Sequence, residues 1–333
     1  MTERAGGGTA ESLPGGAPER TDGGPAGGST PRAVDPTSGS SWSGGELLAA
    51  AAAEVAAACV GVALLWAPQE RLVWQPPRVR AGDLDPPAGA ERLAFASADG
   101  QPLVAWAVEP AGAALGTLLA FHGNAELAVW GVPWARAVAE RSGWRVVLAE
   151  YRGYAGLGGV PAYRHSAPDA WAAYAAAVEG GHPEPFALFG HSLGSAVAAE
   201  LAVALERSGQ APGALVLQSP FTSVRAMARM DRGPGAAALW ERVARVHFDT
   251  VARVAELRAP VWVAHGAVDA VVPVRMGRRV FAAARRPGAL LVVDDAGHNR
   301  VPERGGARYW RWIGGALEAA RAAGAAAAPA VLP

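Results

Sequence analysis

The chain has one cysteine, Cys59, and no lysine. A single cysteine excludes intramolecular disulfides, a C-x-x-C redox pair and zinc sites built from several thiolates. The charges also cancel, because 30 basic residues, all of them arginine, face 30 acidic ones. This neutrality gives no indication of a nucleic-acid partner. We interpret the abundance of alanine and arginine as a compositional bias rather than as a sign of function.

Large apolar side chains are scarce in residues 1–45, which consist mainly of Gly, Pro, Ser, Thr and Ala. Such a segment cannot bury enough surface to offset its conformational entropy, so we expect a disordered tail. Residues 326–333 are expected to form a second flexible tail.

Residues 46–67 are an apolar run of about the length that crosses a bilayer as a helix. Alanine contributes little to insertion, and Glu54 opposes it. A single-pass membrane anchor is the interpretation we favour, against a packing helix or a cleaved signal. Arg71, Arg78 and Arg80 follow the run closely and favour the cytoplasmic side for the C-terminal domain.

Residues 68–90 contain several prolines and turn-forming residues and are expected to be a linker. From 91 to 325, apolar segments of strand length alternate with segments of helical character. We predict a hairpin from the first two strands and a buried parallel sheet from the others. The predicted strands are Arg92–Ser97, Leu103–Val108, Gly116–Phe121, Arg145–Ala149, a strand beginning at Phe186, Ala214–Gln218, Pro260–Ala264 and Ala289–Val293.

This alternation predicts an α/β fold: one domain over 91–325, with a mostly parallel, doubly wound sheet and helices on both faces. Ligands bind at the carboxyl ends of the strands in such sheets. The polar motifs follow strand ends, which places a site at that edge. Residues 219–259 contain only short helical segments and are expected to form a short lid-like insertion.

Ser192 is the centre of Gly190-His191-Ser192-Leu193-Gly194, which joins an apolar strand to an alanine-rich helix. A G-x-S-x-G sequence in this setting is typical of a nucleophile elbow. The pentapeptide alone is a weak signal, and a serine that merely caps the helix is the alternative interpretation.

A serine hydroxyl needs a base within hydrogen-bond reach and an acid that orients the base. Asp269 and His298 follow Ser192 in the chain, each just past the end of a late strand. We therefore predict a Ser192, Asp269 and His298 triad. Asp294 and Asp295 compete as the acid, and with His298 they could also be metal ligands, but no second ligand group accompanies them. No cofactor and no metal are expected.

The predicted oxyanion donors are the backbone N–H of Leu193 and a group on the turn after strand 116–121. Gly123 permits an unusual backbone in that turn, and Asn124 presents its amide. His122, His191 and His265 lie beside glycines in strand-end turns, where we expect them to shape loops or line the site.

With these motifs the chain resembles the α/β-hydrolase superfamily, and within it the membrane-anchored, small-lid branch related to depalmitoylating abhydrolase-domain proteins and serine-aminopeptidase-like hydrolases. The resemblance implies the same triad, with Asn124 and Leu193 as oxyanion donors, and strengthens the anchor interpretation. The motifs are Phe121-His122-Gly123-Asn124-Ala125, Tyr151-Arg152-Gly153-Tyr154, Gly190-His191-Ser192-Leu193-Gly194, Ser219-Pro220-Phe221-Thr222-Ser223, His265-Gly266-Ala267-Val268-Asp269 and Gly297-His298-Asn299.

Two residues depart from that branch. Glu150 stands where it usually has aspartate, and Glu126 follows the oxyanion turn where glycine is common. If the Glu126 carboxylate pointed inward, it would oppose the developing negative charge.

We expect a serine hydrolase that cleaves an ester, thioester or amide through an acyl-enzyme. A peptidase or acyl transferase on the same triad is one alternative, and a non-catalytic membrane-associated scaffold is another. The expected partner is a small-molecule or acylated substrate; oligomeric state stays open. The expected substrate pocket is lined by Trp130, Trp134, His191, Phe221 and Val271.

Overall fold

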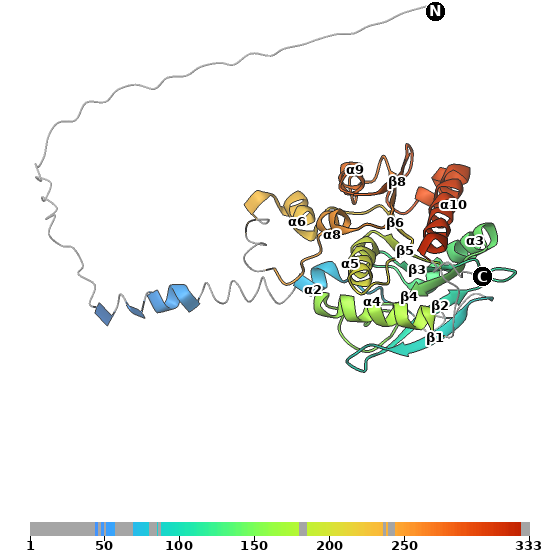
Figure 1. Cartoon of the computed structure of the whole chain (residues 1–333). Helices are drawn as coiled ribbons and strands as arrows, with labels where there is room; N and C mark the ends of the chain where they lie inside the picture. Colours follow the sequence, from blue (N-terminus) through green and yellow to red (C-terminus); the bar gives the residue numbers. More distant parts are fainter. Residues whose placement is uncertain are drawn as a thin grey trace, which may run out of the picture. The chain divides into compact units, whose positions relative to one another are not determined.

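A computed structural model describes residues 44–45, 48–49, 51–56, 69–79, 85, 88–179, 185–235, 238 and 244–327 (Figure 1). The chain divides into two units, Met1–Glu54 and Val55–Pro333, and the account below concerns the second. Most of the expected tails 1–45 and 326–333 and most of the expected anchor at 46–67 lie outside the described residues. Among the residues that are described, no helix is both long enough and apolar enough to cross a membrane.

An eight-stranded sheet forms the centre of the second unit, in the order β1-β2-β4-β3-β5-β6-β7-β8. The first two pairings, β1 with β2 and β2 with β4, are antiparallel, and the others are parallel. The strands are β1 (Glu91–Ala96), β2 (Pro102–Val108), β3 (Thr117–Phe121), β4 (Arg145–Ala149), β5 (Phe186–His191), β6 (Ala214–Gln218), β7 (Val261–Gly266) and β8 (Pro287–Val293). The predicted fold class is confirmed.

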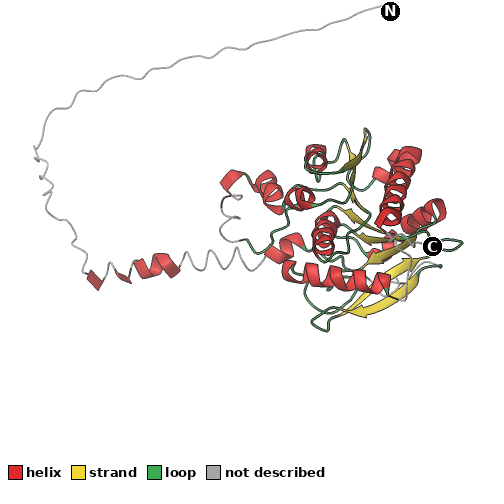
Figure 2. Ribbon diagram, in the orientation of Figure 1, coloured by secondary structure: helices red, strands yellow, loops and turns green. Residues whose placement is uncertain are grey.

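Helices cover both faces of the sheet (Figures 1 and 2). Every residue of β3, β4, β5 and β6 is buried, which explains why these segments are mostly apolar, with one polar residue at an end of each. On one face lie α3 (Val132–Ser142), preceded by the 3-10 turn η2 (Ala128–Gly131), and α10 (Val301–Ala327); on the other lie α4 (Tyr163–Val178), α5 (Leu193–Arg207), α8 (Thr250–Glu256) and α9 (Val274–Ala282).

The sequence predicts helices over 168–178 and from about 305 to 323, and both begin earlier in the structure. Helix α4 begins at Tyr163, so that Pro168 lies inside it. Helix α10 begins at Val301 and continues through Gly306, whose backbone is not helical (φ 48°, ψ −131°). The predicted lid-like insertion contains α6 (Val224–Arg232) and α8, and most of the helix predicted for 236–246 lies outside the described residues.

The linker prediction for 68–90 is wrong for its first part. Residues Gln69–Val73 form helix α2, and the next residue, Trp74, is only 4% exposed. Its indole packs edge-on against Tyr151, with ring centroids 5.3 Å apart, and against Phe248. These contacts join residues distant in sequence, so local turn propensity could not reveal them. This segment is part of the catalytic domain.

Arg152 connects the hairpin loop to helix α4. Its guanidinium donates two hydrogen bonds to Asp169, at 2.6 and 2.5 Å, and two to Asp99, at 2.8 and 3.2 Å. The Arg152 side chain is buried, and that of Asp169 is nearly so. Planar guanidinium and carboxylate groups match well in this two-bond geometry, so the pair fixes the loop after β4 against α4.

We expect Asp169→Asn to lower the free energy of unfolding by about 3 kcal/mol, because it leaves a buried guanidinium without its main counter-charge. Urea unfolding followed by circular dichroism measures this change. The matched control is Asp295→Asn, which breaks an exposed pair with Arg304 and should change stability by less than about 0.5 kcal/mol. Equal effects in the two variants would contradict this account.

Candidate active site

Ser192 occupies a sharp turn between β5 and α5. Its backbone has φ 51° and ψ −113°, which is strained for a residue with a side chain. The flanking glycines make this turn possible. A Cβ at Gly190 would lie 2.3 Å from the carbonyl oxygen of Gly194, and a Cβ at Gly194 would lie 2.2 Å from that of Phe121. Only glycine allows this close crossing.

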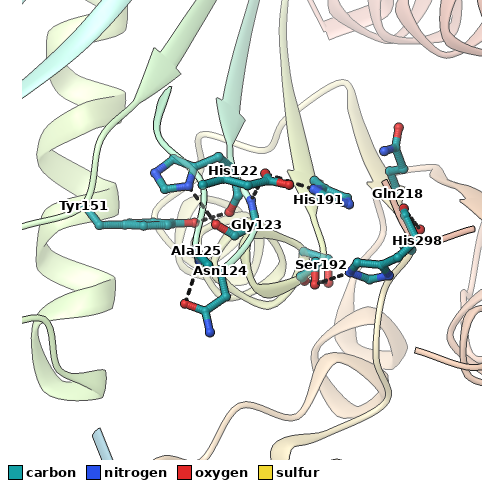
Figure 3. A network of polar contacts seen from close by, with 12 residues as sticks. His122, Gly123, Asn124, Ala125, Tyr151, His191, Ser192, Gln218 and His298 are labelled. Atoms are coloured by element: carbon teal, nitrogen blue, oxygen red, sulfur yellow. Dashed lines mark hydrogen bonds and ion pairs between the residues drawn. The ribbon is translucent and has the colours of Figure 1, made fainter. Parts of the chain in front are cut away.

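The structure brings Ser192, His298 and Asp269 into one hydrogen-bonded series. Figure 3 shows the contact between Ser192 and His298. The Oγ atom of Ser192 lies 2.8 Å from Nε2 of His298, and Nδ1 of His298 lies 2.7 Å from Oδ2 of Asp269. These residues follow β5, β8 and β7 respectively, at the carboxyl edge of the sheet. The competing acid Asp295 instead pairs with Arg304.

Asp269 is held by four donors. The backbone N–H groups of Val271 and Val272 donate to Oδ1 at 2.9 and 2.8 Å, while His298 and His265 approach Oδ2 at 2.7 and 3.2 Å. Burial alone would raise the pKa of Asp269, but the hydrogen bonds from His265 and His298 outweigh it and hold that pKa well below its usual range. The carboxylate therefore stays ionised.

His265 is fully buried and contacts Asp269, which was not expected from the sequence. Its Nε2 lies 2.7 Å from the carbonyl oxygen of Val272, so this nitrogen carries the proton and also faces the carboxylate. Gly277 leaves room for the ring, since a Cβ there would lie 2.2 Å from Nδ1. The spacing of four residues between His265 and Asp269, across a strand end, was the available signal.

The Asn124 side chain points away from Ser192 (Figure 3). Its oxygen accepts hydrogen bonds from the backbone N–H of Ala125 at 3.0 Å, from that of Gln75 at 2.9 Å and from the Tyr154 hydroxyl at 2.8 Å. These hydrogen bonds stabilise the turn that carries Asn124. An oxyanion contact from Asn124 would therefore come from its backbone N–H.

Glu126 turns back toward the turn that follows β3. Its Oε2 accepts a hydrogen bond from the backbone N–H of Gly123 at 2.8 Å and lies 3.2 Å from Nδ1 of His191. Burial raises its pKa, but the charge and hydrogen bond of His191 and the bond from Gly123 outweigh this and lower the pKa to about 2. The N–H of Gly123 is thus already engaged.

A buried His122 and Glu150 pair lies beneath the same turn. Nε2 of His122 lies 2.8 Å from Oε1 of Glu150, which also accepts the N–H of Tyr151, while the other oxygen accepts that of Ala128. Burial opposes the charged imidazole, but the attraction and hydrogen bond of Glu150 outweigh it and raise the pKa of His122. Glu150 therefore has a supporting role.

A cavity of about 430 Å³ adjoins the turn and the nucleophile strand. Trp130, Trp134 and His191 line it, as expected from the sequence, together with Phe189 and Leu148. Two expected lining residues lie elsewhere: Phe221 is 5% exposed in the core and Val271 is 54% exposed. A larger groove of about 750 Å³ lies at the amino ends of the strands, remote from Ser192.

We expect Gly194→Ala to disrupt the elbow, because the added methyl group would meet backbone atoms of Phe121 and His122 that cannot rotate away. The variant should lose several kcal/mol of unfolding free energy or fail to fold, as measured by thermal and urea unfolding. Gly314→Ala in α10 is the control, since nothing lies within 4 Å of its Cβ position. A Gly194→Ala variant as stable as this control would contradict the described crossing.

The family model described as "Thioesterase domain" matches residues 118–258. An uncharacterized Mycobacterium tuberculosis protein, Rv2307c, is 34% identical over 72% of this chain and 83% of its own length. The alpha/beta hydrolase domain-containing protein WAV2 of Arabidopsis thaliana is 30% identical over 75% of this chain and 88% of its own.

Among solved structures, the Pyrococcus furiosus esterase Pf2001 superposes with a TM-score of 0.54 at 17% identity, covering 74% of this chain and 97% of that one. This likeness supports the fold alone, whereas the sequence relatives show the family. The chain belongs to the α/β-hydrolase superfamily.

Proposed function

We propose that this hydrolase cleaves an ester or thioester through an acyl-enzyme formed on Ser192. The observation that carries the proposal is the hydrogen-bonded series from Ser192 through His298 to Asp269, with the serine on a strained turn. A hydroxyl in this setting can pass its proton directly to the imidazole while its oxygen attacks a carbonyl carbon.

In the first half-reaction, Ser192 Oγ forms a bond to the acyl carbon and Nε2 of His298 takes its proton. Asp269 stabilises the imidazolium through Nδ1 and holds the ring in the required orientation. The tetrahedral intermediate then collapses, and His298 returns the proton to the leaving oxygen or sulfur. In the second half-reaction, water attacks the acyl-enzyme with His298 as base, which releases the acid and restores Ser192.

The tetrahedral intermediate carries a negative oxygen that needs preorganised N–H donors. Our proposal assigns this role to the backbone N–H of Leu193, at the first turn of α5, and to that of Asn124. Support for the first comes from its position directly after Ser192. Two contacts support the assignment to Asn124. The backbone N–H of Gly123 is bonded to Glu126, and the side-chain oxygen of Asn124 is bonded to Gln75 and Tyr154, so the backbone N–H of Asn124 is the donor of this turn that we assign to the oxyanion.

The cavity that adjoins β5, lined in part by His191, the residue before Ser192, supports an apolar acyl group as the substrate's recognised part. Trp134 and Phe189 form a tilted ring pair there with centroids 4.5 Å apart, and Trp130 is half exposed at the same cavity. Apolar walls of this kind bind hydrocarbon by removing it from water. The match to the thioesterase model favours ester and thioester bonds over the peptidase alternative.

Labelling with a fluorophosphonate probe tests the proposal, since the probe phosphorylates an activated serine. We expect the full chain to be labelled and Ser192→Ala to stay unlabelled. An unlabelled native chain would favour the scaffold alternative, and label on both would show that another serine reacts. Rates on p-nitrophenyl esters of increasing acyl length would then define the acyl group that the cavity accepts.

Asp269→Asn should lower kcat by about 10⁴-fold, because an amide cannot stabilise the imidazolium and favours the wrong imidazole tautomer. Steady-state kinetics on a p-nitrophenyl ester measure this, with circular dichroism to establish that the variant folds. Asp294→Asn provides the control on the loop of His298 and should keep kcat within about threefold. A folded Asp269→Asn variant with native kcat would exclude Asp269 as the acid.

A further inference from the structure

Glu126 joins the two loops that surround Ser192. We propose that it is a positioning residue, which couples the oxyanion turn to the nucleophile elbow and so fixes the distance between the two oxyanion donors. This inference rests on the proposed function. It assigns a positioning role to a carboxylate that would oppose the developing negative charge if it pointed inward.

One oxygen atom makes both contacts. Oε2 of Glu126 accepts the backbone N–H of Gly123, two residues past the end of β3, and also faces Nδ1 of His191, the last residue of β5. Figure 3 shows Gly123 and His191 near each other. Gly123 immediately precedes Asn124, and His191 immediately precedes Ser192. The carboxylate therefore ties together the residues next to each proposed reactive group.

The loops are packed closely at this point. A Cβ added to Gly123 would lie 2.9 Å from Nδ1 of His191 and 3.0 Å from Oε2 of Glu126. Ala125 has φ 55°, a left-handed conformation that turns the chain back so that Glu126 reaches Gly123. A non-glycine residue remains in this conformation only when its surroundings hold it there. The Glu126 contacts supply that restraint on the side facing Ser192.

The other side of the turn is held separately. The Tyr154 hydroxyl and the Gln75 N–H both donate to the Asn124 side chain, and Glu150 holds His122 from below. With Glu126 removed, these contacts would keep the turn folded but leave its face toward the elbow free to shift. A shift of about 1 Å in a preorganised donor can cost about 100-fold in rate.

The Glu126 charge is also balanced where it lies. Its pKa of about 2 keeps the carboxylate ionised at neutral pH, and the Gly123 N–H and His191 Nδ1 both lie within hydrogen-bond distance of Oε2. The side chain is 29% exposed, so water screens it further. These contacts direct the carboxylate to Gly123 and His191 and away from an unpaired approach to the reacting carbonyl.

The test compares Glu126→Met, which keeps the length but removes the acceptor, with Glu126→Gln, which keeps an acceptor oxygen for the Gly123 N–H. Both are made in the full chain. The measurements are kcat and KM on a p-nitrophenyl ester and the inhibition constant of an arylboronic acid, which forms a tetrahedral adduct on an active serine. Glu256→Ala is the control, because Glu256 accepts hydrogen bonds from Arg207 and Arg253 on the surface.

For Glu126→Met we expect kcat to fall about 10- to 100-fold with KM within threefold, and the boronate inhibition constant to rise by a similar factor. Glu126→Gln should recover kcat to within about fivefold of the native value, and the control should match the native chain. If Glu126 only stabilised the folded protein, boronate binding would not weaken in parallel with the fall in kcat.

The inference is overturned if Glu126→Met keeps native kcat, if its loss falls on KM alone, or if Glu126→Gln is as impaired as Glu126→Met. Should Glu126→Met fail to fold, Glu126→Ala is measured in its place against the same criteria. Fluorophosphonate labelling of the native chain separates the two levels: an unlabelled native chain defeats the proposed function, whereas a labelled one with a fully active Glu126→Met defeats only this inference.

Discussion

The close crossing of α5 over the end of β3 is the constraint on which the site depends. It requires bare backbone at Gly190 and Gly194, and it forces Ser192 into a conformation that a serine rarely adopts. The surrounding sheet compensates for this strain, since β3 and β5 are fully buried between two layers of helices. The fold therefore holds the hydroxyl in place before any substrate arrives.

Around this fixed point, each polar group is held by partners from other elements. Asp269 receives two backbone donors and two imidazoles, and the turn carrying Asn124 is braced by Gln75, Tyr154 and Glu126. Such satisfied networks lose little freedom during reaction, which is how preorganised electrostatics stabilise a transition state. The segment 69–79 therefore contacts the site through the backbone N–H of Gln75, which donates to the Asn124 side chain.

Much of this arrangement could be predicted from the sequence. The buried strands are mostly apolar, which predicted the sheet. Ser192, Asp269 and His298 each follow a strand end, which predicted that they meet at the carboxyl edge of that sheet. The contact of Trp74 with Phe248 and that of Glu126 with His191 could not be predicted, because each joins residues whose approach depends on the finished fold. For His265 and Asp269 the only signal was their spacing of four residues. Phe221 and Val271 do not line the cavity beside β5, because proximity to a strand end does not fix which way a side chain faces.

The central claim is that Ser192 becomes acylated during turnover. Rapid acid quench of the full chain with a p-nitrophenyl ester, followed by peptide mass spectrometry, tests it most directly. The account predicts an acyl group on the peptide containing Ser192, formed within the first turnover and lost as product appears. Turnover with the acyl group on another residue, or with no acylated peptide under conditions where release is slow, would contradict it.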